Sequence, residues 1–412
     1  KMVNKDKIAL HWKIVLALVL GVIIGAILQL EVMADWSQQI AAILKFGASI
    51  FLRLLKMVVV PLVASSLFVG VTSVASNRDL GKIGLRTAFY YITTSTLAIG
   101  IGLLMVNLIQ PGKGAKLGLT VPALTDIQTP GSLWDILLRM IPTNPVAALA
   151  QFDMIGIIFF SILFAVFTTT LQKSEREPVV RFFNSFYKVM MKIVHSIIAL
   201  APYGVFCLIA NLIATTGFAV FVPLFKYLVT VTLALAVHFF IILPLIAKFF
   251  AGKNPLNYLT AMAPALLTAF SSASSAATLP LTMECAEKRG AIPSRITHLV
   301  LPLGATVNMD GTALYEGVAV LFIAQALGVD LGLLQQATVL LTALLVSIGA
   351  AGIPHAGLVM MVIILEAVGL PLEATGMIWA VDRVVDMART ATNVWSDSIG
   401  AAVVAHYESS SD

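Results

Sequence analysis

Charged side chains are scarce in this sequence: Lys, Arg, Asp and Glu together make up only 11% of its 412 residues. A soluble domain has about 25%, whereas here 59% of the residues are hydrophobic. The alternating apolar and polar residues typical of membrane-barrel strands are also lacking. These absences exclude a soluble globular protein and a barrel, and they predict an all-helical integral membrane protein.

Cysteine is nearly absent as well, with only Cys207 and Cys285, far apart in the sequence. No disulfide framework or metal motif can be built from them. The formal net charge of +5 comes from basic residues in short clusters between apolar runs. That arrangement is not typical of nucleic-acid binding. It fits the excess of positive charge on the cytoplasmic side of membrane proteins.

The first half of the chain contains six apolar segments of membrane-spanning length, at 12–30, 45–74, 83–109, 146–171, 185–213 and 222–250. The links 75–86 and 172–192 are basic, and the link 31–42 has acidic residues without Lys or Arg. This pattern predicts a cytoplasmic N-terminus in a multi-pass membrane protein. The first segment follows three lysines, as in a signal peptide. It lacks a small-residue cleavage site, so we expect a retained helix.

The second half begins with two short apolar arms that flank the serine-rich residues 271–275. Each arm has about 13 residues, or about 20 Å as a helix, which is too short for a hydrocarbon core of about 30 Å. We therefore expect a re-entrant hairpin. A full-length segment follows at 297–325, interrupted by glycine and polar residues near its middle.

The same pattern then repeats. Two apolar arms at 333–347 and 358–370 flank the Gly- and Pro-rich residues 348–357, and a polar-striped segment at 376–405 ends the chain. A hairpin followed by a broken helix, twice over, is typical of inverted repeats in secondary transporters. We expect eight membrane helices and two re-entrant hairpins, with four ordinary helices as the alternative to the repeat.

The segment 376–405 has a stripe of five polar residues spaced four, three, four and four apart: Asp382, Asp386, Arg389, Asn393 and Asp397. They share one helical face. A charged residue at mid-helix costs about 2.5–3.5 kcal/mol on an insertion scale. The stripe should therefore face protein, water, ions or a solute, and intramembrane charges are functional-site candidates by default.

Within this stripe, Arg389 offers a planar fork of donors that fits a carboxylate. Asp386, one turn earlier, would attract an ammonium group. The two together suit a zwitterion with an additional acid group. The alternative is an internal ion pair between Asp386 and Arg389, and such a pair sealed from any cavity would argue against solute binding. Arg383 is expected to pair with Asp382 and Asp386 rather than with the solute.

Residues 308–312 lie in the middle of the segment 297–325, where Gly304 and Gly311 weaken the helix. Unwinding there would free backbone carbonyl groups that can bind a hard cation. Four side chains add oxygen ligands of the kind that sodium prefers: Asn308, Asp310, Asn393 and Asp397. The alternative is that these groups only form hydrogen bonds between helices.

Three further polar residues are candidates. Glu316 has no obvious basic partner and is expected to be protonated part of the time. It could serve as a proton carrier or only as a buried polar group. Thr94 and Ser95 could join an ion site or bond to carbonyl groups of their own helix.

Four motifs together resemble those of the glutamate transporter family, the dicarboxylate/amino acid:cation symporters: residues 274–280, 308–312, 347–354, and 386–390 with Asn393. The resemblance, to a prokaryotic member, extends from the first segment to about Tyr407. It implies a homotrimer in a bacterial inner membrane, with cytoplasmic N- and C-termini, that works by an elevator mechanism. The scaffold would comprise residues 1–78 and 111–221. The moving transport domain would comprise 79–110 and 222–412.

The resemblance also implies roles for individual residues. Arg389 matches the position that binds the side-chain carboxylate of the substrate, and Asp386 the one that binds its amino group. The implied substrate-binding residues are Ser274, Ser275, Thr312, Ile353, Gly357, Asp386, Arg389, Thr390 and Asn393. One sodium site would use Gly304, Asn308, Asn393 and Asp397. A second would use Thr306, Ser347, Ile348 and Ala350. A third would use Tyr91, Thr94, Ser95, Asn308 and Asp310.

The sequence departs from the family pattern at several positions. Ala273 replaces an arginine of archaeal members, and Arg383 stands on the last helix instead. Glu316 resembles animal members, in which a glutamate here accompanies proton cotransport. His355 stands where many members have glycine, and Ala350 replaces a threonine, although a backbone ligand survives that change.

The resemblance and the side chains together predict a symporter for L-aspartate or L-glutamate, coupled to sodium ions, with or without a proton. Arg389 favours an acidic solute and Asp386 favours an amino acid. The alternatives are a proton-only symporter of the same solutes and a C4-dicarboxylate symporter. An ion channel is a weaker candidate. An intramembrane enzyme is not expected, because no local nucleophile motif is present. No cofactor is expected besides the co-transported sodium.

Overall fold

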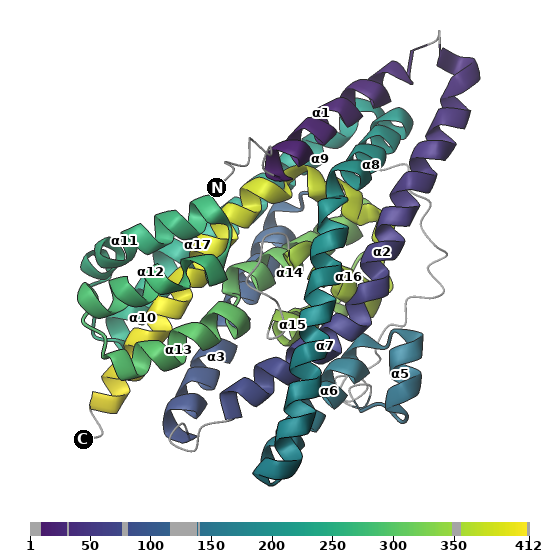
Figure 1. Ribbon diagram of the computed structural model, residues 1–412. Coiled ribbons are helices and arrows are strands. Elements are labelled where there is room, and N and C mark those ends of the chain that lie inside the picture. The colour runs from purple at the N-terminus through teal and green to yellow at the C-terminus, as the bar shows by residue number, and fades with distance from the viewer. Residues whose placement is uncertain are drawn as a thin grey trace, which may run out of the picture.

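The computed structural model describes residues 10–30, 33–75, 81–115, 138, 141–347 and 356–409, and this part of the chain is helical without a β-strand (Figure 1). The first half forms α1 (Leu10–Ile27), α2 (Ala34–Ala75), α3 (Gly81–Ile109), α5 (Pro145–Gln151), α6 (Met154–Thr170), α7 (Lys173–Ala199) and α8 (Ala201–Thr216). The predicted all-helical class is confirmed for these residues.

The helices of the first half differ from the expected segments at three places. Helix α2 begins at Ala34 and α7 at Lys173, so parts of both predicted links are helical. The segment expected at 146–171 is broken between α5 and α6, where Phe152 adopts a left-handed conformation with φ 58°. The next residue, Asp153, caps α6 by accepting a hydrogen bond from the backbone N–H of Gly156. Such a side chain commonly starts a helix.

The second half continues with short helices and one long one. Its elements are η4 (Gly217–Val220), α9 (Phe221–Val237), the π-helical turn η5 (His238–Ile242), α10 (Leu243–Phe250), α11 (Pro255–Ser272), α12 (Ser275–Lys288), α13 (Ser294–Val307), α14 (Asp310–Ala326), α15 (Leu333–Ser347), α16 (Ala356–Ala367), η6 (Leu372–Ala374) and α17 (Thr375–Ser409). These bounds lie within a few residues of the predicted ones, apart from the longer first arm, α11.

The first expected hairpin is a pair of helices, α11 and α12, that pack against each other. Ala273 connects them in a left-handed conformation with φ 51°. Ser274 then caps α12 by accepting a hydrogen bond from the backbone N–H of Ala277 at 3.2 Å. The serine-rich tip is therefore a tight helix-to-helix turn. Its entry into the membrane from one side stays a prediction.

The second expected hairpin consists of α15 and α16, which also pack together. Most of its tip, residues 348–355, lies outside the described residues. Between the two pairs, the predicted unwinding is confirmed: α13 ends at Val307 and α14 starts at Asp310. Asn308 and Met309 have extended or irregular backbone angles there.

By length and composition, three helices of the described part could each cross a membrane, at 36–72, 83–109 and 221–250. The pair α7 and α8, bent by 48° at their junction, could form a fourth crossing. Several other expected spans are shorter or interrupted: α1 and α6 are short, and α13 and α14 are separated by the unwound residues. The chain is thus a membrane protein with several apolar helices, and the total of eight stays a prediction.

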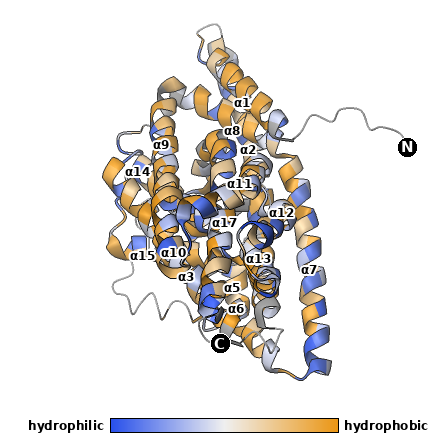
Figure 2. Ribbon diagram, turned by 90° about the vertical axis from the view of Figure 1, so that its left-hand side faces the viewer, coloured by the Kyte–Doolittle hydropathy of each residue, from blue (hydrophilic) through white to orange (hydrophobic). Residues whose placement is uncertain are grey.

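Two groups of helices can be distinguished by their packing (Figure 1). In one group, α1 packs on α8, and α2 packs on α6, α7 and α8. In the other, α14 contacts α3, α9, α15, α16 and α17, while α17 also contacts α11, α13 and α10. Figure 2 shows hydrophobic residues along most of the helices, with hydrophilic residues gathered on α7, mainly toward its lower end.

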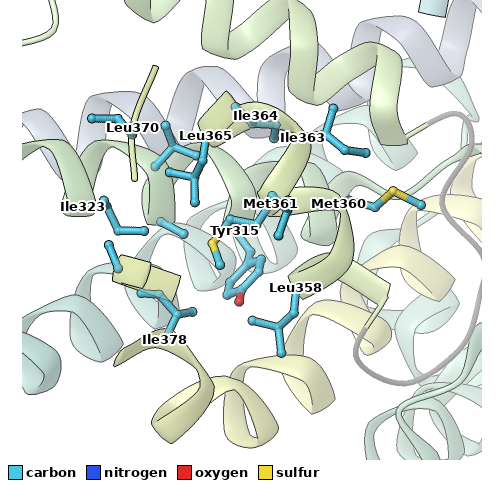
Figure 3. Packing of buried hydrophobic residues seen from close by; sticks show 14 of the residues in the cluster. Tyr315, Ile323, Leu358, Met360, Met361, Ile363, Ile364, Leu365, Leu370 and Ile378 are labelled. Atoms are coloured by element: carbon cyan, nitrogen blue, oxygen red, sulfur yellow. The ribbon is translucent and has the colours of Figure 1, made fainter. Parts of the chain in front are cut away.

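Helix α14 lies at the centre of the second group, and nearly all of its residues are buried. Figure 3 shows Tyr315 and Ile323 of α14 packed near Leu358 and Met361 of α16 and Ile378 of α17. Because α14 and α17 are both enclosed by other helices, the polar residues of the two can meet away from lipid. This contact between α14 and α17 is where the candidate site lies.

Candidate solute and cation site

The polar stripe of α17 faces the protein interior, as predicted. Asp382, Asp386, Arg389, Asn393 and Asp397 are each no more than 4% exposed. Hydrophobic residues would fill this space at a lower free-energy cost, because buried charges must be paired or hydrogen-bonded. The partners of each stripe residue therefore determine what the site can do.

The centre of the site is the guanidinium group of Arg389. Its Nε and Nη2 atoms donate hydrogen bonds to Oδ1 of Asp386 at 3.0 and 2.7 Å. Its Nη1 atom lies 3.4 Å from Oδ1 of Asp382. The guanidinium carbon lies 4.6 Å from the ring centroid of Tyr315, and the Tyr315 hydroxyl donates to the same oxygen of Asp382 at 3.0 Å. Arg389 is thus held by two carboxylates and an aromatic face.

This arrangement is the internal ion pair that the sequence left open as an alternative to solute binding. Asp386 and Arg389 are both 2% exposed, so neither is open to solvent in this structure. Arg383, as expected, lies near the acids, with its Nη1 atom 3.9 Å from Oδ2 of Asp386. Two arginines and two aspartates, Asp382 being the fourth member, make the cluster formally neutral. Removing one member of such a buried set leaves an uncompensated charge.

Gly357, at the start of α16, packs directly against this cluster. A Cβ atom at Gly357 would lie 2.4 Å from Nη1 of Arg389 and 3.2 Å from a methyl carbon of Thr312. The structure therefore brings together three predicted substrate-binding residues from α14, α16 and α17. Gly311 lies equally close, since a Cβ there would be 2.5 Å from the backbone oxygen of Arg389. Glycine at both positions lets these helices approach.

Asn393 links α17 to the start of α14. Its Oδ1 atom accepts a hydrogen bond from the backbone N–H of Gly311 at 2.7 Å, and its Nδ2 atom donates to Oγ1 of Thr312 at 3.2 Å. The hydroxyl of Thr390 donates to the carbonyl of Asp386 on its own helix at 2.8 Å. Asn393 and Thr312 are thus hydrogen-bonded to each other beside Arg389.

The other predicted substrate-binding residues come from the hairpin tips. Ser275 is buried, with 4% of its surface exposed. The Ser274 hydroxyl oxygen accepts a bond within its own tip, from the backbone of Ala277. Ile353 lies outside the described residues. A direct contact between these three residues and Arg389 therefore stays a prediction.

Asp310, fully buried at the start of α14, is the centre of the expected third cation site. Its carboxylate accepts hydrogen bonds from the hydroxyls of Ser95 at 2.6 Å and Ser396 at 2.7 Å. Nε2 of His238 lies 3.1 Å from Oδ2 of the same carboxylate. Ser95 thus joins Asp310, whereas the Thr94 hydroxyl bonds back to the carbonyls of its own helix at 3.1 and 3.3 Å.

The expected first cation site is centred on Asp397. Asn308 donates from Nδ2 to Oδ1 of Asp397 at 2.9 Å and to the Ser396 hydroxyl at 3.0 Å. A Cβ atom at Gly304 would lie 2.5 Å from Oδ1 of Asp397 and 2.8 Å from the Tyr91 hydroxyl. The carboxylate therefore rests against the backbone of α13 just before it unwinds. The Tyr91 hydroxyl itself donates to the carbonyl of Val300 at 2.8 Å.

Asn308 also has a buried Oδ1 atom without a hydrogen-bond partner among the described residues. An oxygen of this kind is costly unless a donor or a cation satisfies it. Asn308 bonds to Asp397 and to Ser396, which in turn bonds to Asp310, so this oxygen belongs to the same network and is available to a hard cation. The oxygen-rich set of neutral and acidic groups is suited to sodium.

The expected second cation site is only partly described. The Thr306 side chain is exposed and donates to the carbonyl of Leu303, while buried Ser347 donates to the carbonyl of Leu344. Ile348 and Ala350 lie outside the described residues. Both described hydroxyls bond to their own helices, which would leave backbone carbonyls as the ligands.

Glu316, the candidate proton carrier, is fully buried on α14. Neither of its carboxyl oxygens has a hydrogen-bond partner among the described residues. A carboxyl group in that position is more easily accommodated as the neutral acid. The absence of a basic partner for Glu316 stays a prediction.

Three site residues were not identified from the sequence: His238, Tyr315 and Ser396. His238 is a polar residue in the middle of an apolar segment, which by itself marks a functional candidate. It also lies in the π-helical turn η5, a feature frequent at functional sites. Ser396 follows Asn393 by three residues on the same helical face. Tyr315 had no sequence signal, because an aromatic residue in a buried helix is usual.

A family model described as the sodium:dicarboxylate symporter family matches residues 10–407. The chain belongs to this family. It is 36% identical to the proton/glutamate-aspartate symporter of Escherichia coli over 98% of this chain and 93% of that protein. It is also 36% identical to the proton/sodium-glutamate symport protein of Geobacillus stearothermophilus, over 98% and 95%. Human excitatory amino acid transporter 3 is 38% identical over 87% of this chain and 78% of that protein.

As a member of the sodium:dicarboxylate symporter family, the chain is a membrane transporter and not an enzyme. This confirms the family resemblance inferred from the four motifs. Its described residues contain no group of three or more His, Cys, Asp or Glu side chains that could hold a metal ion. The expected cation sites, which rest mainly on backbone, hydroxyl and amide oxygens, are of a different kind.

Proposed function

We propose that this protein takes up L-aspartate or L-glutamate together with sodium ions. The observation that supports this most directly is the cluster of Asp386, Arg389 and Asp382 in contact with Gly357 and Thr312. It provides the cationic fork of Arg389, with Asp386 one turn and Asp382 two turns earlier on the same helix, enclosed by α14 and α16. Relatives named as glutamate and aspartate symporters, 36% identical over nearly the whole chain, support the same solutes.

Solute binding in this proposal exchanges the partners of an existing ion pair. The solute carboxylate replaces Asp386 on Arg389, and the solute ammonium group takes the freed Asp386. Arg389 and Asp386 each keep a charged partner throughout, which limits the desolvation penalty. A dicarboxylate brings no ammonium group to replace Arg389 on Asp386, which would keep only its 3.9 Å approach to Arg383 among the ion pairs described here, so the C4-dicarboxylate alternative is disfavoured.

Cations are proposed to bind beside the solute at the start of α14. Asp310 with Ser95, and Asp397 with Asn308 and Gly304, provide two oxygen-rich positions within the same buried network. Asn393 connects this network to the solute residues through Thr312. Occupation of the cation positions would fix the unwound backbone at Asn308, and through it the geometry of Thr312. Coupling between cation and solute follows from that shared element.

Proton-only symport is a second candidate, favoured by two specific observations. Glu316 is buried without a hydrogen-bond partner among the described residues, as a proton carrier would be. His238 occupies one side of Asp310, where a cation ligand would otherwise be expected. The Escherichia coli relative is named as a proton symporter and the Geobacillus relative as a proton and sodium symporter.

The transport movement is proposed to be an elevator motion within a homotrimer. The group formed by α1, α2 and α5–α8 would be the scaffold, and α3 with α9–α17 would be the moving domain. The packing supports this division, because the strongest associations lie within each group. The site lies wholly within the proposed moving domain, so a rigid displacement could carry it across the membrane.

The decisive experiment for coupling is uptake of radiolabelled L-aspartate into proteoliposomes. We expect concentrative uptake when sodium is higher outside, and little uptake when choline replaces sodium at equal pH. Uptake that follows a pH gradient and ignores sodium would favour proton-only symport. Succinate that competes as well as L-aspartate would favour the dicarboxylate alternative.

A further inference from the structure

A cavity outside the transport site lies where α2 and α6 end and α7 begins. It has a volume of about 250 Å³ and is lined by Thr72, Thr169, Arg176, Glu177, Val180 and Arg181. On α7 the lining residues are spaced as i, i+1, i+4 and i+5, so they share one helical face. That face is directed at the last turns of α2 and α6.

Two arginines give this cavity its chemistry. Among the described residues, neither Arg176 nor Arg181 forms an ion pair with a carboxylate. Glu177, also in the lining, is 3.8 Å from Lys173 at i−4. The lining thus holds two guanidinium groups and one carboxylate, a net charge of +1. Arginine forks match the oxygen geometry of phosphate groups.

Two large apolar side chains close to the cavity face outward. Phe167 on α6 and Phe182 on α7, next to the lining residues, are each 62% exposed. In a membrane protein such side chains contact acyl chains, so a lipid whose chains lie on them would place its headgroup at the arginines. The cavity also lies at the basic link 172–192, which the charge pattern assigns to the cytoplasmic side.

From these observations we propose that this cavity binds the phosphodiester headgroup of an anionic membrane phospholipid. Arg176 and Arg181 would contact the phosphate oxygens, and the acyl chains would lie along Phe167 and Phe182. A phosphodiester has one negative charge and balances the net charge of the lining. A free phosphate monoester has a charge of about −1.5 to −2 near pH 7 and would not be balanced. Basic pockets between membrane helices on the cytoplasmic side are known to bind lipid headgroups.

Bound at this place, the lipid would join the ends of α2 and α6 to the start of α7. All three helices belong to the proposed scaffold. The lipid should therefore stabilise the scaffold and leave the affinity for aspartate unchanged. The lipid site is independent of the proposed transport function, because neither the solute nor the cation residues contribute to it.

The test is native mass spectrometry of the purified full-length protein, titrated with dioleoyl phosphatidylglycerol in detergent. We expect the Arg176→Gln/Arg181→Gln double variant to bind the lipid at least tenfold more weakly than the unchanged protein. Arg295→Gln removes an exposed arginine of α13 outside the cavity and should stay within twofold. The Arg176→Lys/Arg181→Lys variant keeps the charge without the forks and should give an intermediate affinity.

Three further measurements make the test specific. Dioleoyl phosphatidylcholine and sn-glycerol 3-phosphate should each bind at least tenfold more weakly than the anionic lipid. Size-exclusion profiles should show that every variant is folded. Equal lipid binding by the folded double glutamine variant would overturn the proposal. Equally strong binding of glycerol phosphate would identify a free-anion site instead, and equally strong phosphatidylcholine binding would contradict the preference for an anionic headgroup.

Discussion

Arg389 donates two hydrogen bonds to a single oxygen of Asp386, one turn earlier on the same buried helix, at 2.7 and 3.0 Å. The second oxygen of that carboxylate is left to Arg383, 3.9 Å away. The two groups proposed to hold a zwitterionic solute therefore hold each other in this structure. A solute must separate them, so one of its carboxylates must match Arg389 and its ammonium group must match Asp386.

Replacement of Arg389 by cysteine should abolish uptake of L-aspartate and L-glutamate and admit neutral amino acids. The change removes the partner of Asp386 and Asp382 and leaves space beside Tyr315. Loss of a buried charge partner costs about 3–5 kcal/mol, so the variant should also unfold at lower temperature. Proteoliposome uptake of labelled aspartate and serine measures the change in selectivity.

The matched control for this variant is Arg295→Cys, which alters an exposed arginine away from the site. It should retain aspartate uptake within about twofold. Aspartate affinity unchanged by Arg389→Cys in a folded protein would exclude Arg389 as a binding residue and leave the pair with a purely structural role.

Gly357→Ala should weaken aspartate binding by tenfold or more, which is about 1.4 kcal/mol. The added Cβ would meet Nη1 of Arg389 at 2.4 Å, and Arg389 is prevented from moving freely by its bonds to Asp386. Gly100→Ala is a suitable control, because a Cβ atom on that glycine of α3 would meet nothing within 4 Å. Isothermal titration of both variants provides the comparison. Equal affinities would mean that Gly357 does not define the solute space.

The sequence was sufficient to predict the position of nearly every helix, because long apolar runs and polar breaks are local signals. The unwound residues at Asn308 and the buried face of α17 followed directly from glycine positions and from i, i+4 spacing. The spacing could not show whether Arg389 binds a solute or Asp386. Arg389 one turn after Asp386 is compatible with solute binding and with an internal pair, and only the geometry shows which exists here.

Most of the site residues that were not predicted from the sequence reach the site from other segments of the chain. His238 and Ser396 contact Asp310 from segments 72 and 86 residues away in sequence. Tyr315 contacts Arg389 through its ring, for which there is no polar pattern to find. The structure also shows that Thr94 bonds to its own helix while its neighbour Ser95 reaches Asp310. Adjacent hydroxyls cannot be distinguished by sequence alone when only one faces the site.

Asp310→Asn should raise the sodium concentration needed for half-maximal aspartate uptake by at least tenfold. The amide keeps the size of the side chain but removes the charge that would balance a cation beside Ser95 and Ser396. Asp330→Asn, at an exposed position after α14, removes the same charge outside the site and should have no effect. Sodium titration of initial uptake rates measures the difference. An unchanged sodium dependence in Asp310→Asn would place the cation elsewhere.

An ion pair between Lys56 of α2 and Glu366 of α16 connects the two proposed domains. Nζ of Lys56 also lies 5.0 Å from the ring centroid of Phe152. If the domains slide past each other, this pair must break in each cycle. Lys56→Gln and Glu366→Gln should each increase the maximal uptake rate, with little change in the aspartate concentration for half-maximal uptake.

The pair is partly exposed, so its contribution is limited to about 0.2–1 kcal/mol. The expected rate increase is therefore no more than about fivefold. A double-mutant cycle with Lys56→Gln/Glu366→Gln should show that the two effects are not additive. Additive effects, or rates unchanged in both single variants, would mean that the pair does not limit the movement.

The proposed exchange separates Arg389 from Asp386, so that Arg389 binds a carboxylate of the acidic amino acid and Asp386 binds its amino group. Its most direct test is isothermal titration with L-aspartate and with succinate, which lacks the amino group, in sodium-containing buffer. We predict that the unchanged protein binds aspartate at least a hundredfold more tightly than succinate. Asp386→Asn should reduce this preference to less than tenfold. An undiminished preference for aspartate in the folded Asp386→Asn variant would show that Asp386 does not bind the amino group.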